Sequence, residues 1–132
     1  MNVANQQECV FCRKEDAHSL FDNHLAFAIS DAFPLSAGHA LIIPKRHVVS
    51  LFDATPEEIT ALHMLMSRVR EHLCSVYHPD GFNIGINDGE AAGQTVMHLH
   101  IHLIPRYHGD VADPRGGIRW INPVKADYWS IE

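Results

Sequence analysis

An amphipathic pattern between Thr55 and the His-Pro-Asp-Gly turn at 78–81 predicts one long α-helix. The segment Thr55-Pro56-Glu57-Glu58 carries the signals of a helix start: a threonine that can cap the helix, a proline at its first position and a glutamate three residues after the cap. Apolar side chains then recur at intervals of three and four residues, which is the spacing of one helix face. They are Ile59, Leu62, Met66, Val69 and Leu73. We interpret Met64 and Met66 as side chains that fill the core.

Four shorter segments have the pattern of β-strands, with apolar residues that alternate with polar ones or run together. They are His24–Ser30, Ala40–Ile43, Phe82–Asn87 and Val96–Ile104. The turn residues of Pro34–His39 lie between the first two segments, so these two strands are expected to pair antiparallel. Because strands outnumber helices and most connections are short, the pattern predicts an α+β fold with an antiparallel sheet.

The chain shows no internal repeat and no linker, which indicates a single domain over residues 1–132. From Tyr107 onward the periodicity gives way to glycine, proline and charge. We therefore predict an irregular C-terminal tail over about residues 108–132. A length of 132 residues suffices for one hydrophobic core without disulfides.

The formal net charge of −6 argues against broad electrostatic attraction to nucleic acid or to an anionic membrane. No apolar run approaches the roughly 20 residues that cross a bilayer. The first eight residues lack the basic and apolar regions of a signal peptide. We therefore expect a cytoplasmic protein with neither nucleic acid nor membrane as a partner. An anionic ligand would have to be held locally, by backbone N–H groups and a few cationic side chains.

Three histidines alternate with apolar residues in the segment His98-Leu99-His100-Ile101-His102-Leu103. Since a strand sends successive side chains to opposite faces, the imidazoles are expected on one face and the apolar side chains on the other, toward the core. Neighbouring histidines would then lie about 6.6 Å apart. A polar sheet face that uses histidine by chance is the structural alternative. A metal site is another, because alternating strand histidines can chelate zinc.

This segment and its approach from Gly93 closely resemble the signature of the histidine triad (HIT) family, in which three histidines alternate with apolar residues. The resemblance runs from Cys9 to about Arg106 and includes Phe27–Asp31, Gly38–His47 and Asn83–Asp88. It implies a five-stranded antiparallel sheet with two helices, paired into a homodimer. It also implies nucleotide substrates that are cleaved at the α-phosphorus.

The resemblance assigns a role to each matching residue. His100, the middle histidine, would be the nucleophile. Its attack requires a ring nitrogen without a proton, and a hydrogen bond from the other ring nitrogen, typically to a backbone carbonyl, would select that tautomer. His102 would contact the phosphate or leaving group, and His39 would support the triad from a neighbouring strand. The implied substrate contacts are Asn87, Gln94 and Thr95 at phosphate oxygens, Asp31 at the ribose hydroxyls, and Asn83 near the site. Taken alone, the asparagines and the aspartate could instead stabilise turns or strand ends.

Cys9 and Cys12 form a C-x-x-C pair, which by itself leaves three interpretations open. Structural zinc needs four ligands, a redox pair lacks a surrounding thioredoxin-like βαβ pattern, and the thiols could be unoccupied. Some HIT proteins, and the related galactose-1-phosphate uridylyltransferases, place zinc between such a pair and two histidines. By resemblance these would be His47 and His98. The zinc would be structural, and no cofactor would be required for catalysis. We interpret Cys74 as a buried apolar residue of the helix.

Within the family, the resemblance favours a nucleotide hydrolase that acts on dinucleoside polyphosphates or related nucleotidyl compounds through a covalent nucleotidyl-histidine. The Gln-Thr-Val approach to the triad resembles diadenosine polyphosphate hydrolases. The chain length and the cysteine pair resemble the purine nucleoside phosphoramidases equally well. Two other classes stay open. One is a zinc-dependent hydrolase that uses the triad as metal ligands, and the other is a nucleotide-binding module without turnover.

Overall fold

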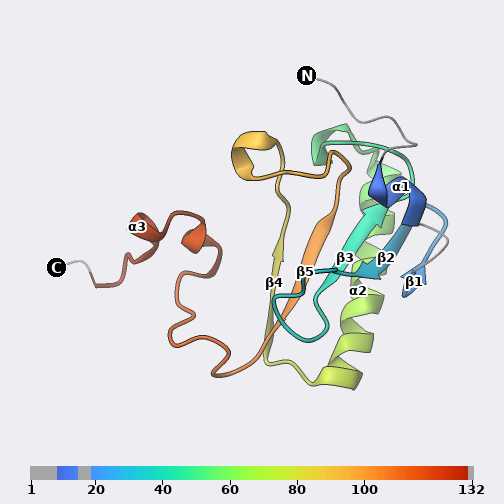
Figure 1. Cartoon of the computed structure of the whole chain (residues 1–132). Coiled ribbons are helices and arrows are strands. Elements are labelled where there is room, and N and C mark those ends of the chain that lie inside the picture. The colour runs from blue at the N-terminus through green and yellow to red at the C-terminus, as the bar shows by residue number, and fades with distance from the viewer. Residues whose placement is uncertain (1–8, 15–18, 131–132) are drawn as a thin grey trace.

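Five strands form one antiparallel sheet in the computed structural model, which describes residues 9–14 and 19–130 (Figure 1). They are β1 (Phe21–Asp22), β2 (Ala26–Ser30), β3 (Ala40–Pro44), β4 (Gly81–Gly85) and β5 (Ile101–Arg106). Their order across the sheet is β1-β2-β3-β5-β4, and every neighbouring pair is antiparallel. The expected α+β fold and the pairing of β2 with β3 are confirmed. The first eight residues, on which the expectation about a signal peptide rests, lie outside the described residues.

The long helix α2 (Pro56–Tyr77) covers one face of the sheet. It begins as predicted, because the Thr55 side chain accepts a hydrogen bond from the Glu58 N–H while the Glu58 carboxylate accepts one from the Thr55 N–H. Arg46 donates two further bonds to that carboxylate, at 2.8 and 3.0 Å. This guanidinium lowers the pKa of Glu58 to about 2. At the other end, His78 adopts the left-handed conformation and closes the helix at the predicted turn.

The buried face of α2 is rotated from the predicted one. Its apolar members are Ala61, Leu62, Leu65, Val69 and Leu73. Ile59 is 39% exposed and Met66 only borders the core. Met64 is 63% exposed, so its interpretation as a core residue was wrong. Cys74 is half-buried rather than buried. Spacing alone cannot separate the two faces, because Leu65 lies beside Leu62 on the helix surface and both sets repeat every three or four residues.

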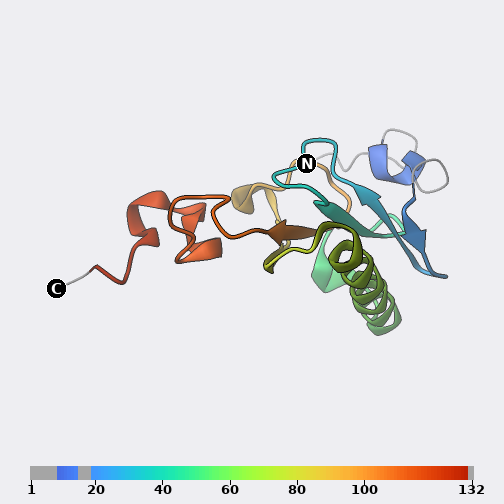
Figure 2. The ribbon, with the colours of Figure 1, turned by 90° about the horizontal axis from the view of Figure 1, so that it is seen from below.

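The opposite face of the sheet is covered by α1 (Val10–Lys14), which lies on the side away from α2 (Figure 2). A second core joins α1 to β2 and β3. Its buried members are Cys9, Phe11, Phe27, Ile29, Leu41 and Ile43. The C-x-x-C segment is therefore a short helix that packs on the sheet through the two apolar residues between its cysteines, of which Phe11 is buried.

The histidine segment enters the sheet later than the pattern predicts, because β5 begins at Ile101 rather than at Val96. Pairing with β3 stops at the same residue. The reason lies at the end of β3, where Pro44 has no N–H to donate and its carbonyl accepts a hydrogen bond from the His98 ring at 2.8 Å. The alternation nevertheless holds. The apolar residues that alternate with the histidines lie in the core under α2: Leu99, Ile101 and Leu103.

The tail beyond β5 contains two short helical turns that the sequence pattern does not predict, a 3-10 turn (Gly117–Ile121) and α3 (Pro123–Ala126). It leaves the sheet beside β4 and extends away from it (Figures 1 and 2). Contacts with aromatic rings join its parts. They are Arg115 over Trp129, Arg119 over Tyr128, and Trp120 against Trp129. In the part of the chain that the structure describes, no helix is long and apolar enough to cross a bilayer.

Candidate active site

His100 is held in the tautomer that leaves Nε2 unprotonated. Its Nδ1 lies 2.8 Å from the backbone carbonyl oxygen of His98. Because a carbonyl oxygen only accepts, Nδ1 carries the proton and Nε2 keeps its lone pair. The predicted bond between the triad imidazole and a backbone carbonyl is thus confirmed. His100 as a whole is only 9% exposed.

A second tautomer is fixed at His102 by a chain of hydrogen bonds. The Leu35 N–H donates to His39 Nδ1 at 3.0 Å, so His39 carries its proton on Nε2. That nitrogen lies 3.0 Å from His102 Nδ1 and 3.3 Å from a carboxylate oxygen of Asp31. Donation to His102 Nδ1 leaves the His102 proton on its own Nε2. The ring thereby presents an N–H donor on the side away from His39.

Burial favours the neutral form of both of these imidazoles. Desolvation lowers the pKa of His39 and is the largest influence on it. It also lowers the pKa of His102, and the neighbouring His100 and His39 act in the same direction. In both cases the Asp31 carboxylate opposes the shift without reversing it. The Asp31 carboxylate thus lies beside two histidines. The resemblance implies a ribose contact for the same side chain.

The four residues implied as zinc ligands lie together. They are Cys9, Cys12, His47 and His98, whose ligand atoms all fall within 4.8 Å of one another. Three of the sulfur-to-nitrogen distances are 3.2, 3.3 and 3.5 Å. Tetrahedral zinc with ordinary bond lengths would separate a sulfur and a nitrogen ligand by about 3.6 Å. The Nε2–H of His98 donates to the Pro44 carbonyl, which leaves its Nδ1 lone pair facing the thiols. The donor set and its geometry therefore fit zinc.

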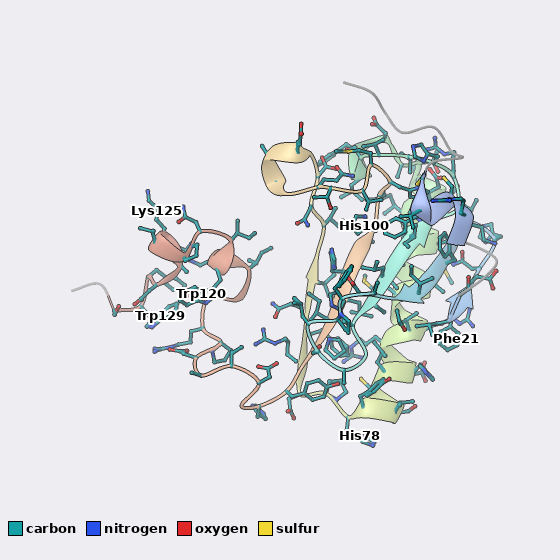
Figure 3. The ribbon with its side chains drawn as sticks, in the orientation of Figure 1. Phe21, His78, His100, Trp120, Lys125 and Trp129 are labelled. Atoms are coloured by element: carbon teal, nitrogen blue, oxygen red, sulfur yellow. The ribbon has the colours of Figure 1, made fainter. Side chains whose placement is uncertain are left out.

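A cavity of about 880 Å³ opens beside His102, over β5 and β4 on the face opposite to α2. Its lining includes the polar side chains of Asp31, His39 and His102. The tail contributes the apolar side chains of Ile118 and Trp120 and the carboxylates of Asp110 and Asp113. Figure 3 shows His100 close to α1 and Trp120 on the tail, beyond β4. The lining of this cavity includes His39 and His102 but not His100, so a nucleotide-sized ligand in it would meet these two histidines and the side chains of the tail.

Gln94 and Thr95 are not among the residues that line this cavity. Gln94 is 3% exposed, and its amide oxygen accepts from the Gly89 N–H at 2.8 Å. Its amide nitrogen donates to the carbonyls of Val49 and Val96. The side chain thus ties together the loop that precedes the triad. Thr95 is exposed on the same loop.

Asn83 and Asn87 do line the cavity. The Asn83 side-chain oxygen accepts a 2.6 Å bond from Arg106, which also makes two bonds to Asp110 at 2.7 and 2.9 Å. Sequence reasoning missed Arg106 as a residue of this site. The signal was present, because Arg106 continues the every-second-residue alternation that passes through His102. Reasoning from sequence also missed Phe11, whose ring lies against His100.

Comparison with known proteins bears on this arrangement. The HIT domain family matches residues 13–109. The chain belongs to the HIT domain family. A solved relative, described as a zinc-bound histidine triad family protein from Mycobacterium smegmatis, superimposes with a TM-score of 0.73 at 38% identity, over 82% of this chain and 81% of that one. The fold of this HIT domain is thus the fold of the family.

Two curated relatives carry names of nucleotide hydrolases. Adenylylsulfatase HINT3 of Arabidopsis thaliana is 36% identical over 109 residues, which cover 80% of this chain and 55% of the relative. The asymmetrical bis(5'-nucleosyl)-tetraphosphatase of Schizosaccharomyces pombe is 42% identical over 89 residues, which cover 67% of this chain and 49% of the relative. This HIT domain therefore spans about half the length of each of these two proteins.

Proposed function

We propose that this HIT domain hydrolyses nucleotides at the α-phosphorus, with His100 as the nucleophile and dinucleoside polyphosphates or related nucleotidyl compounds as substrates. The observation that carries the proposal is the bond from His100 Nδ1 to the His98 carbonyl, because it leaves the lone pair of Nε2 available for attack. The two relatives named as nucleotide hydrolases support the substrate class.

In the first step, the Nε2 lone pair of His100 forms a bond to the α-phosphorus, and the bond from phosphorus to the leaving oxygen breaks. The electron pair departs with the polyphosphate. The His100 ring becomes cationic, and the His98 carbonyl stabilises it by accepting the Nδ1–H. The Nε2–H of His102 donates a hydrogen bond to the leaving oxygen. In the second step, water attacks the phosphorus and releases one proton to the solvent, the nitrogen–phosphorus bond breaks with its electron pair returning to His100, and AMP leaves.

Residues that line the cavity bind and orient the substrate. Asn83 and Asn87 lie on the cavity wall and can donate amide N–H groups to phosphate oxygens. Asp31 can accept from ribose hydroxyls while it stays within reach of His39. Gln94 and Thr95 act indirectly in this scheme, by shaping the loop that leads to His98.

Zinc and a second copy of the chain complete the proposal. Cys9, Cys12, His47 and His98 would hold a structural zinc ion, which would fasten α1 to the start of the triad. No catalytic step passes through it. A homodimer would form along β4, which pairs only with β5 among the described strands. Apolar side chains beside this edge are exposed, including Ile84 at 50% and Ile121 at 81%, and a partner could cover them.

A second candidate activity is the cleavage of adenylyl compounds with a small leaving group, such as a purine nucleoside phosphoramidate. The relationship to the adenylylsulfatase HINT3 favours it. The same two steps apply, and only the departing atom changes. The two candidates are separated by their relative kcat/KM rather than by different site residues.

The test measures AMP release from diadenosine tetraphosphate, diadenosine triphosphate, an adenosine phosphoramidate and adenylyl sulfate. The variants are His100→Ala and, as a matched control, His63→Ala, which removes an exposed histidine on α2. The proposal predicts AMP release by the wild type and the control, and none by folded His100→Ala. Turnover that persists in His100→Ala would point to metal-activated water, and a chelator would then stop it at once. Nucleotide binding without any product would favour a binding module.

A further inference from the structure

We infer that Asn83 binds the phosphate groups of the leaving group, and that Arg106 is the positioning residue that turns the Asn83 amide N–H toward them. This inference rests on the proposed function, in which the α-phosphorus lies at His100. It divides Asn83 and Asn87, the two asparagines of the cavity, between two parts of the substrate. Asn83 thereby sets the relative kcat/KM of substrates with a polyphosphate leaving group and substrates with a small one.

The orientation of the Asn83 amide is fixed by the chemistry of its neighbour. The Nη1 of Arg106 lies 2.6 Å from the Asn83 side-chain oxygen. Because a guanidinium only donates hydrogen bonds, it selects the oxygen of the amide and leaves Nδ2 on the other side. Among the residues that the structure describes, none accepts a hydrogen bond from Nδ2. A β-carbon placed on Gly117 would lie 3.4 Å from this nitrogen, and both residues line the cavity, so the amide presents its N–H donors there.

Arg106 is itself held in place by Asp110. Its Nε and Nη2 donate to the two carboxylate oxygens at 2.7 and 2.9 Å, which is the geometry of a bidentate ion pair. The carboxylate also accepts the Tyr107 N–H at 3.1 Å. These bonds, above all those from Arg106, hold the pKa of Asp110 well below its usual range, so the pair stays charged at neutral pH. With that edge of the guanidinium occupied, Nη1 is directed at Asn83.

The register of the sheet places the two asparagines at different levels of the histidine strand. Asn83 pairs with Ile104 on β5. Ile104 lies two residues beyond His102, which puts Asn83 about 6.6 Å farther along the strand than that histidine. Asn87 follows the other end of β4, toward the level of His100, because the two strands are antiparallel. Asn87 is therefore placed for the α-phosphate, and Asn83 for groups beyond the leaving oxygen.

The order of the strands gives the direction in which the substrate crosses the sheet. Asp31, the proposed ribose contact, directly follows β2, and β3 and then β5 come next in the sheet. His100 directly precedes β5, and β4 is the strand beyond it. A substrate with its ribose at Asp31 and its α-phosphorus at His100 therefore extends its leaving group over β4, the strand that carries Asn83.

The charges around Asn83 allow a polyphosphate to reach it. Arg106 neutralises Asp110, and Arg115 neutralises Asp113 through contacts of 2.9, 3.1 and 3.2 Å. The two carboxylates that the tail adds to the cavity are therefore both paired with an arginine. An amide donor beside paired charges can bind an anionic oxygen without repulsion from an uncompensated carboxylate of the tail.

The first experiment compares two substrates that differ beyond the leaving atom. Diadenosine tetraphosphate carries phosphate groups there, whereas an unsubstituted adenosine phosphoramidate ends at the leaving nitrogen. Asn83→Ala removes the donor, and the loss of a hydrogen bond to a charged group corresponds to about 10- to 100-fold. We expect the ratio of kcat/KM for the tetraphosphate to kcat/KM for the phosphoramidate to fall by that factor in Asn83→Ala. An equal loss on both substrates would overturn the assignment of Asn83 to the leaving group.

The positioning role of Arg106 is tested by a pair variant, Arg106→Met with Asp110→Asn, which keeps the net charge of the chain. We expect the pair variant to lower the same ratio nearly as much as Asn83→Ala does. Combined with Asn83→Ala it should cause no further loss, because a residue that acts only through another adds nothing once that other is removed. The matched control, Asp22→Asn with Lys45→Met, removes an ion pair outside the cavity and should leave the ratio unchanged. Additive losses, or an equal fall in the control, would overturn the positioning role.

The second experiment does not depend on turnover. Affinities for AMP and ATP are measured in the His100→Ala background, where the β- and γ-phosphates of ATP stand in for the leaving group. The inference predicts that Asn83→Ala and the pair variant weaken ATP binding about 10- to 100-fold more than AMP binding. If the wild type cleaves neither substrate, the proposed function fails, and this comparison decides the role of Asn83 by itself. Equal changes in the two affinities would overturn that role.

Discussion

Two substitutions at His39 separate the two hydrogen bonds that its ring makes. Asparagine places an amide near the position of the ring Nδ1 and can keep accepting the Leu35 N–H, but it does not extend to His102. Glutamine is longer, and its amide N–H can replace the Nε2–H that meets His102. Both variants leave the triad itself intact. They therefore test whether His39 acts on catalysis by fixing the tautomer of His102.

The expected loss of kcat in His39→Asn follows from the loss of the 3.0 Å contact between His39 Nε2 and His102 Nδ1. Without this donor, His102 Nδ1 is left unpaired, or the His102 ring proton moves from Nε2 to Nδ1 and points toward the Asp31 carboxylate oxygen, which lies 3.7 Å away. An unpaired buried acceptor costs about 1–3 kcal/mol, and about 1.4 kcal/mol corresponds to a factor of ten in rate. We expect kcat of His39→Asn to fall roughly 10- to 100-fold with KM nearly unchanged, and His39→Gln to recover most of the loss.

The assay measures kcat and KM for AMP release and, in the free protein, the nitrogen chemical shifts of the His102 ring. These shifts report which ring nitrogen carries the proton. The reasoning predicts a proton on Nε2 in the wild type and in His39→Gln, and its redistribution in His39→Asn. Equal kcat values for the two variants would refute it, and so would a His102 ring whose proton stays on Nε2 in His39→Asn.

Three further predictions concern stability. Acidification below about pH 6.5 should lower the free energy of unfolding of the metal-free protein. Burial lowers the pKa of His39, His98 and His102 in the folded state, so the unfolded chain takes up protons first as the pH falls. Urea titrations at neutral and mildly acidic pH measure the free energy of unfolding, and greater stability in acid would contradict the prediction. Chelation of zinc should lower Tm by an amount on the order of 10 °C, since zinc at a thousandfold excess over its Kd would stabilise the folded state by about 4 kcal/mol. Calorimetry with and without zinc measures the change, and an unchanged Tm would count against the zinc site. Leu65→Ala should cost about 2–5 kcal/mol and Ile59→Ala less than about 1 kcal/mol, because of these two side chains only that of Leu65 is buried. A larger loss in Ile59→Ala than in Leu65→Ala, measured by urea unfolding, would favour the predicted helix face.

The parts of the fold that depend on local chemistry could be predicted from the sequence. The capping box at Thr55 forms as predicted because its bonds join residues three apart. Leu99, Ile101 and Leu103 face the core because strand geometry alternates regardless of the neighbouring strand. The His100 bond to a carbonyl could be expected because it joins two residues of the same motif.

Features that depend on the partner element could not be predicted in the same way. The buried face of α2 includes Leu65 because of how the helix lies on the sheet. The start of β5 depends on Pro44, which is more than fifty residues away from the histidines in sequence. The position of Phe11 against His100 depends on contacts between the N-terminal cysteines and residues beyond β3. The sequence also contains no local pattern that distinguishes the Gln94 amide as a loop brace from a phosphate ligand.

The central claim is that His100 becomes covalently bound to the nucleotide during turnover. The most direct measurement is the intact mass of the protein, quenched within a single turnover with diadenosine tetraphosphate or an adenosine phosphoramidate. The account predicts a transient species heavier by one adenylyl group, which decays as AMP appears. That species should be absent from folded His100→Ala and present in His63→Ala. AMP release by the wild type without any adduct, or an adduct that persists in His100→Ala, would contradict it.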